Sequence, residues 1–233
     1  MAKPLMPSVS GTPVNQLPCY QRLPSRRALA APALRTSFTL DQPTLTLNTI
    51  QTRTAYEALW ETGVLTLDPA LAEEGFEEAY AWMAQQMAHR LSTHGDGILW
   101  LWAKYSRREL VREARRCRGE VLLTVHVERE RVLLRYFDDW HMVLNNGYLV
   151  SDVPGETYDE YDARYEVASH GWDARSEGLR NLPRAEWPAD LRAELEATWQ
   201  AIFDPAVLAA TRSVQATVHE ILATDVVRAV RIA

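Results

Sequence analysis

The feature that most constrains the fold is an alternating stretch near the middle of the chain, Val121 to Glu128. Its strongly apolar residues recur at every second position, which is typical of a half-buried strand. A polar break at Glu128 to Glu130 precedes a second apolar run, Arg131 to Leu134. The pattern predicts two strands within Gly119–Leu149, and therefore a protein built around a sheet.

The second predicted strand runs directly into an acidic and aromatic turn, Phe137-Asp138-Asp139-Trp140-His141. Asp138 is suited to cap a short helix over Asp139–Asn145, with Trp140 on its inner face. Asn146-Gly147 would end this helix, because both residues tolerate a positive φ.

The same turn carries the first candidate site. Asp138 and His141 stand three residues apart, so in a helix they would share a face. They would suit a general base and its orienter, or two metal ligands of a hydrolase. An ordinary helix cap is the alternative. Elsewhere, His94 and Asp96 in the loop Ser92–Gly97 lack a further ligand at a fixed spacing, and we predict no bound metal for the protein. The candidate pocket residues here are Asp138, Trp140, His141 and Asn145.

The rest of the chain supplies the other elements of an α+β domain. Residues 1–43 hold seven of the twelve prolines and show no periodicity, which predicts a flexible, Pro-rich extension. Residues 44–233 are predicted to form one α+β domain with a mixed or mostly antiparallel sheet flanked by helices. Further strands are predicted at Leu45–Thr52, Ile98–Tyr105, Val214–Leu222 and Arg228–Ile232, helices at Phe76–Leu91 and after Pro188, and a loop with a marginal helix at Ser151–Gly178.

Charge and cysteine content exclude several classes of protein. The net charge of −6 gives no global basic field that would attract nucleic acid or an anionic membrane. An arginine-rich stretch at 107–118 is either a solvated helix face or a local patch for nucleic acid or phosphate. The two cysteines, Cys19 and Cys117, are far apart, and no run reaches the ~18 apolar residues of a membrane span. These features, and a start without a secretory signal, predict a cytoplasmic protein.

Two later segments add candidate residues. In a continuous strand from Val214 to Leu222, Gln215 would share one face with Thr217 and His219, while Glu220 would lie on the other. Gln51 is a polar residue inside the first strand, and Trp102 lies on one face of its strand with Trp100. Gly-rich phosphate loops, nucleophile-elbow serines, paired cysteine ligands and His-Glu-x-x-His motifs are all missing from the sequence.

Several of these segments resemble a bacterial family known as domain of unknown function 3841. The resemblance covers roughly Leu45 to Ile232, and it brings no established activity. It rests on Thr49-Ile50-Gln51-Thr52, Trp100-Leu101-Trp102, Phe137-Asp138-Asp139-Trp140-His141-Met142-Val143-Leu144-Asn145, Trp199-Gln200-Ala201-Ile202-Phe203-Asp204 and Gln215-Ala216-Thr217.

A second resemblance concerns the order of the elements. A polar residue in the first strand, a helix ending in Gly-Val-Leu, an aromatic middle strand and a late strand with Glu resemble ADP-ribosyltransferase-like domains. This resemblance implies an NAD-binding enzyme of a toxin or defence system. Gln51 would then contact NAD, Trp102 would stack on nicotinamide and Glu220 would be catalytic. The alternative is a non-catalytic module that binds protein or nucleic acid.

Overall fold

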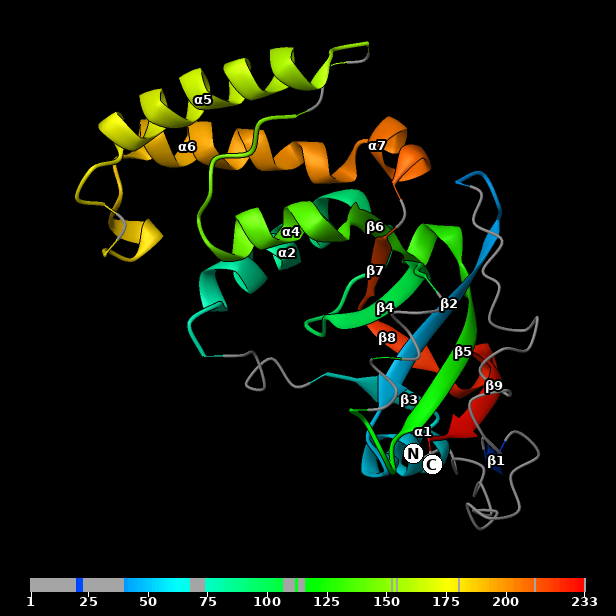
Figure 1. Cartoon of the computed structure of the whole chain (residues 1–233). Helices are drawn as coiled ribbons and strands as arrows, with labels where there is room; N and C mark the ends of the chain where they lie inside the picture. The colour runs from blue at the N-terminus through cyan, green and yellow to red at the C-terminus, as the bar shows by residue number, and fades with distance from the viewer. Residues whose placement is uncertain are drawn as a thin grey trace.

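The predicted α+β class is confirmed by a computed structural model, which describes residues 20–22, 40–67, 74–106, 112, 116–151, 153, 155–179, 181–211 and 213–232. Its centre is a seven-stranded sheet in the order β1-β9-β5-β2-β4-β7-β6 (Figure 1). Neighbouring strands are antiparallel except for the parallel pair β1 and β9. A second, two-stranded sheet joins β3 to β8.

The strands are short, and most were predicted from alternation. Their bounds are β1 (Tyr20–Arg22), β2 (Thr44–Gln51), β3 (Val64–Thr66), β4 (Leu99–Lys104), β5 (Val121–Glu128), β6 (Leu133–Tyr136), β7 (Val214–Val218), β8 (Glu220–Leu222) and β9 (Val226–Arg231).

The helices range from 6 residues in α7 to 18 residues in α5. The α-helices are α1 (Arg53–Thr62), α2 (Glu77–Arg90), α4 (Phe137–Leu144), α5 (Tyr158–Arg175), α6 (Ala189–Thr198) and α7 (Pro205–Ala210). Single 3₁₀ turns are η5 (Arg129–Arg131), η6 (Arg184–Glu186), η7 (Trp199–Phe203) and η8 (Ala223–Asp225).

One face of the large sheet packs against α1 and the small sheet. Leu123 and Val125 of β5 are fully buried there with Tyr56 and Leu59 of α1. The Thr52 side chain caps α1, and Gly63 ends it with a φ of 82°, a conformation that favours glycine. This core is aliphatic and continuous, so it fixes the sheet.

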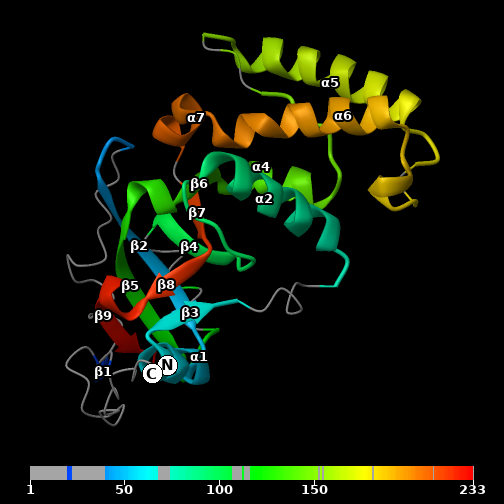
Figure 2. The same cartoon turned by 180° about the vertical axis from the view of Figure 1, so that it is seen from behind.

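The opposite face of the sheet packs against helices. Trp82 of α2 is edge-on to Trp199 of η7, with ring centroids 5.3 Å apart, and both are buried. In Figures 1 and 2, α2 and α4 lie next to the sheet, α6 and α7 lie beyond them, and α5 lies outermost across α6. Helices therefore lie at three successive levels above this face of the sheet, and the outermost helix, α5, has solvent on one side.

Two predicted elements were wrong. The segment predicted as a loop with a marginal helix, Ser151–Gly178, instead holds a full 18-residue helix, α5. The strand predicted over Val214–Leu222 breaks at His219, whose Nδ1 lies 3.1 Å from the carbonyl oxygen of Gly97. Glu220 therefore belongs to β8 and pairs with Thr66 in the small sheet.

Two further predictions concern segments that the structure describes only in part. Most of the arginine-rich stretch 107–118 lies outside them, so its predicted helix and binding patch stay predictions. Of the extension 1–43, residues 20–22 and 40–43 are described, and Tyr20–Arg22 form β1 beside β9.

Candidate functional site

The outermost helix, α5, begins with a complete capping box. The Thr157 side chain accepts a hydrogen bond from the Glu160 N–H, and the Glu160 carboxylate accepts one from the Thr157 N–H at 2.8 Å. Trp172 is the buried residue of this helix. Its indole stacks on the Tyr148 ring, with centroids 5.1 Å apart. The helix is therefore stabilised locally at its start and anchored to the body near its end.

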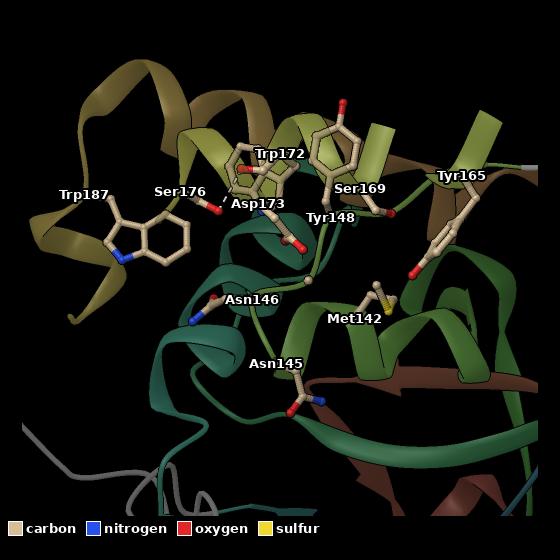
Figure 3. Close-up of a pocket in the computed structure, with 11 residues that line it drawn as sticks. Met142, Asn145, Asn146, Tyr148, Tyr165, Ser169, Trp172, Asp173, Ser176 and Trp187 are labelled. Carbon is tan, nitrogen blue, oxygen red and sulfur yellow. Dashed lines mark hydrogen bonds between the residues drawn. The ribbon is translucent and has the colours of Figure 1, made fainter. Parts of the chain in front are cut away.

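A cavity of about 310 Å³ lies between the C-terminal half of α5 and the end of α4 (Figure 3). Side chains of α5 form one wall, and the end of α4 with the turn after it forms the other. The lining residues are Met142, Asn145, Asn146, Gly147, Tyr148, Tyr165, Ser169, Trp172, Asp173, Ser176 and Trp187. Aromatic rings and polar groups thus meet in one open space.

A second cavity, of about 510 Å³, lies at the N-terminal end of α5. Its lining residues are Tyr136, Asp139, Val150, Ser151, Val153, Glu156, Thr157, Tyr158, Tyr161, Ala201 and Val207. Tyr158 is 78% exposed and Val153 is 51% exposed, so this cavity opens on a surface with unusually exposed apolar side chains.

The same two segments of chain, α5 and the residues after α4, contribute to the lining of both cavities. Tyr161 of the larger cavity and Tyr165 of the smaller one are one helical turn apart, with rings stacked at 6.1 Å. Gly147 and Tyr148 line the smaller cavity, and Ser151 lines the larger one. We call these two cavities together the α5 groove. An 18-residue helix is about 27 Å long at ~1.5 Å per residue, which sets the length of the groove.

The charged side chains that line the α5 groove, within the described part of the chain, are acidic: Asp139, Glu156 and Asp173. Arg164 hydrogen-bonds to Glu156 at 2.7 and 2.8 Å and lowers the pKa of that carboxyl. Burial, together with a hydrogen bond to Asp138, raises the pKa of Tyr136 to about 12. Arg164 therefore offsets the charge of Glu156, which leaves Asp139 and Asp173 as the further acidic lining residues, and Tyr136 is a neutral phenol at physiological pH.

The predicted pair Asp138 and His141 does not form a base and its orienter. His141 Nδ1 lies 3.1 Å from the main-chain oxygen of Asp138 and not against its carboxylate. That carboxylate accepts hydrogen bonds from Tyr136 at 2.9 Å and Ser213 at 3.2 Å. Asp138 is also not the N-cap, because α4 begins at Phe137; it lies in the first turn, where a negative charge favours the helix dipole.

The other two predicted residues of this turn lie in different environments. Asn145 lines the α5 groove and donates a hydrogen bond to the His141 carbonyl at 2.7 Å. Trp140 is not among the lining residues of either cavity and is buried in the helical core. In the described residues, no group of three or more His, Cys, Asp and Glu side chains could hold a metal ion.

The structure does not bring Gln51, Trp102 and Glu220 to one place. Asn48 is the cross-strand partner of Trp102, so their side chains share a face of the sheet. Gln51 comes three residues after Asn48 and therefore projects from the opposite face, where it donates to Thr49 Oγ1 at 2.9 Å. Glu220 lies in the small sheet.

The structure also shows a buried arginine, Arg135, that was not among the predicted site residues. It lies between two residues that were, Trp140 and Gln215. Arg135 is 1% exposed, and its guanidinium lies 4.4 Å from the Trp100 ring centroid and 4.5 Å from that of Trp140. Its Nη2 donates a hydrogen bond to the Gln215 side-chain carbonyl. Alternation alone signals it, because Leu133 and Arg135 share a strand face on which a charge is unexpected.

Comparison with protein families matches residues 46–227 to the family described as Domain of unknown function (DUF3841). The chain belongs to this family. The DUF3841 match covers α5, both cavities of the groove, and Arg135 with its neighbours Trp100, Trp140 and Gln215, which we call the Arg135 cluster. Neither a curated protein nor a solved structure matches the chain. No helix in the described part of this DUF3841 chain is long and apolar enough to cross a membrane.

Proposed function

We propose that the protein is a non-catalytic binding module that recognises an extended, basic protein segment in the α5 groove. The observation that carries this proposal is the combination of aromatic walls with exclusively acidic charges among the described lining residues. Both features favour the binding of lysine and arginine side chains, because cations are attracted to aromatic faces and to carboxylates.

The size and surface of the groove fit a polypeptide. A groove of about 27 Å accommodates roughly eight residues of an extended chain at ~3.3–3.6 Å each. Tyr158, Val153 and Tyr165 are 78%, 51% and 38% exposed along it. Exposed aromatic and apolar side chains beside charges are typical of interfaces between proteins. The net charge of −6 would accelerate the encounter with a basic partner.

The proposal is tested with a fluorescein-labelled nonapeptide of alternating arginine and alanine, titrated with the protein and followed by fluorescence anisotropy. A peptide of the same length with glutamate in place of arginine is the negative probe. The expected result is saturable binding of the arginine peptide alone, weakened by added salt.

Variants of the groove distinguish a site from a general attraction to negative charge. Asp173→Asn and Tyr165→Ala are each expected to raise Kd about 3- to 10-fold, since each removes ~0.7–1.4 kcal/mol of cation binding. Asp159→Asn removes the same charge from an exposed α5 position outside both linings and should change Kd less than about twofold. Equal effects of Asp159→Asn and Asp173→Asn would show that only net charge matters, and would refute the proposal.

NAD binding and ADP-ribosyl transfer receive less support from the geometry, because Gln51, Trp102 and Glu220 lie apart. Acidic lining groups also disfavour a pyrophosphate in the α5 groove. A thermal-shift titration with NAD tests the enzyme hypothesis directly. A ligand that binds the folded state raises Tm once the ligand concentration exceeds Kd. A dose-dependent rise together with NAD turnover that Glu220→Gln abolishes would replace the binding-module proposal.

A further inference from the structure

The residues of α5 that line the two cavities lie along one face of the helix. In chain order they include Tyr158 and Tyr161 at the larger cavity, then Tyr165, Ser169 and Trp172 at the smaller one. Successive members of this series are three or four positions apart, which is the spacing of residues that share one face of a helix. Both cavities therefore open on the same side of α5, and a single partner segment can contact both.

Two hydrogen bonds join the walls of the α5 groove between the cavities. The Tyr161 hydroxyl donates one to the Val150 carbonyl oxygen at 3.4 Å, and Nη2 of Arg164 donates one to the Ser151 carbonyl oxygen at 2.7 Å. We call these two contacts the bridge. Tyr161 is the last α5 residue that lines the larger cavity, and the next residue of the series, Tyr165, lines the smaller one. A partner must therefore cross the bridge to occupy both cavities.

The charges of the two cavities differ in sign from the charge at the bridge. Asp139 lies in the lining of the larger cavity and Asp173 in that of the smaller one. At the bridge, the Arg164 guanidinium forms an ion pair with Glu156, and its side chain is still 36% exposed. Cations are attracted to the two carboxylates and repelled by Arg164. The groove therefore favours a segment that is basic in each cavity and uncharged where it crosses the bridge.

The length of α5 between the cavities sets the spacing of the two basic residues. Asp173 is twelve positions after Tyr161 and fifteen after Tyr158, which is about 18 and 22 Å along the helix at ~1.5 Å per residue. In an extended chain, side chains point to the same side only at even separations. Separations of four, six and eight residues cover roughly 13, 20 and 26 Å at ~3.3 Å per residue. Among these, the separation of six residues is the one that fits.

We propose that the partner segment carries two basic residues six positions apart, one for each cavity, with uncharged residues between them. This inference rests on the proposed function, because it specifies the basic segment that the α5 groove recognises. One basic side chain meets Asp173 and the Tyr165 ring in the smaller cavity. The other meets Asp139 and the Tyr158 ring in the larger cavity, and the residues between them cross the bridge in an extended conformation.

The test compares two fluorescein-labelled peptides of eleven residues with the same composition, two arginines among alanines and serines. The wide peptide has its arginines at the third and ninth positions, and the narrow peptide has them at the fifth and seventh. A general attraction to negative charge gives both peptides the same Kd, since their net charges are equal. When the full chain is titrated into each peptide, fluorescence anisotropy should show at least about fivefold tighter binding of the wide peptide, because its second arginine binds intramolecularly.

Variants of the two cavities show whether both are used. Asp173→Asn and Asp139→Asn should each raise the Kd of the wide peptide to about that of the narrow one. A peptide with a single arginine can use either cavity, so each variant should change its Kd by no more than about twofold. Asp159→Asn is the matched control and should leave the preference for the wide peptide intact. Lysine at the middle position of the wide peptide should not tighten binding, because it meets Arg164.

The outcomes separate the spacing from the proposed function. Equal Kd values for the wide and narrow peptides would overturn the spacing, but the binding-module proposal would stand if Asp173→Asn still weakened both. A gain of about threefold or more from the central lysine would show that total charge decides binding, and would also overturn the spacing. Failure of both peptides to bind would overturn the spacing, and failure of the alternating peptide of arginine and alanine as well would refute the proposed function.

Discussion

The Tyr148 ring lies flat against the Trp172 indole, with centroids 5.1 Å apart and planes inclined by 28°. Tyr148 belongs to the segment after α4, and Trp172 is the buried residue of α5. This contact therefore joins both walls of the α5 groove near one end, and together with the Arg175–Glu194 ion pair it holds α5 on the body.

Replacement of Trp172 by alanine should release α5 without unfolding the sheet. Loss of a buried tryptophan typically costs about 3–5 kcal/mol, but here most of that loss falls on the attachment of a peripheral helix. Hydrogen exchange followed by mass spectrometry should show loss of protection over residues 158–175 while β5 keeps its protection. Tyr165→Ala, which leaves the Tyr148–Trp172 contact intact, should preserve both. A uniform loss of protection in β5 and α5 would contradict this expectation.

Acid should loosen the start of α5. Arg164 lowers the pKa of Glu156, and the Thr157 main chain and side chain lower that of Glu160, both from an ordinary value of 4.5. A carboxyl with a lowered folded-state pKa stabilises the fold above its unfolded pKa, and this stabilisation is lost as pH falls through the folded value.

We therefore expect amide protection in the first turns of α5 to fall as the pH drops below about 4.5. Amide protection in the sheet should be lost only at a lower pH. Glu156→Gln should remove part of this pH dependence, because the variant has no carboxyl to protonate at that position. Protection of α5 that is equal at pH 6 and pH 3 would argue against these contacts.

Alkali should affect the other cavity through Tyr136. Its pKa is raised to about 12, chiefly by burial. Between about pH 10 and 12 the unfolded state loses this proton while the folded state keeps it, so stability falls as pH rises. The urea midpoint should decline less between pH 9.5 and 11 in Tyr136→Phe than in the wild-type protein. Identical slopes would show that Tyr136 ionises at its ordinary pKa in the folded state.

Arg135 and Gln215 should behave as a coupled pair in stability measurements. Gln215→Leu removes the one hydrogen-bond acceptor that the described residues offer to the buried Arg135, and should lower the free energy of unfolding by about 1–3 kcal/mol. The double variant Arg135→Met/Gln215→Leu removes both polar groups and should be at least as stable as the wild-type protein, since buried charges are often replaced by apolar groups at no cost. Urea midpoints measure both. A double variant less stable than Gln215→Leu alone would show that Arg135 stabilises the fold.

The sheet was the part most accessible from the sequence. Alternation identified β5 and β2 because the face of each strand that packs on the core is continuous and aliphatic. Every second residue is therefore apolar, which is the pattern that predicts a strand. The same rule failed at His219, because a hydrogen bond to Gly97, far away in sequence, redirects the chain between two sheets. Glu220 was therefore assigned to a face of a strand that it does not occupy.

The candidate site was less accessible for a related reason. α5 buries only Trp172, so it shows no apolar stripe, and its only local signal is the capping box of Thr157 and Glu160. Arg135 is buried by Trp100, Trp140 and Gln215, which come from three separate elements. Such contacts exist only after the sheet and helices assemble. Trp140 and Gln215 were nevertheless among the predicted pocket residues, and Asn145 lines the α5 groove.

The excursion that carries α5 leaves the body and returns to it at nearly the same point. Arg184, just before the return, donates a hydrogen bond to the Asn146 side chain at 3.0 Å, and Trp199 donates one to the Gly147 carbonyl at 2.8 Å. None of the sheet strands passes through this interval. The segment from Gly147 to Pro188 therefore lies outside the sheet, but its Leu149, Trp172 and Trp187 belong to the helical core together with Trp82 and Trp199. Exchange of this segment between DUF3841 proteins would thus have to keep these three side chains, whereas its exposed residues could change without effect on the sheet.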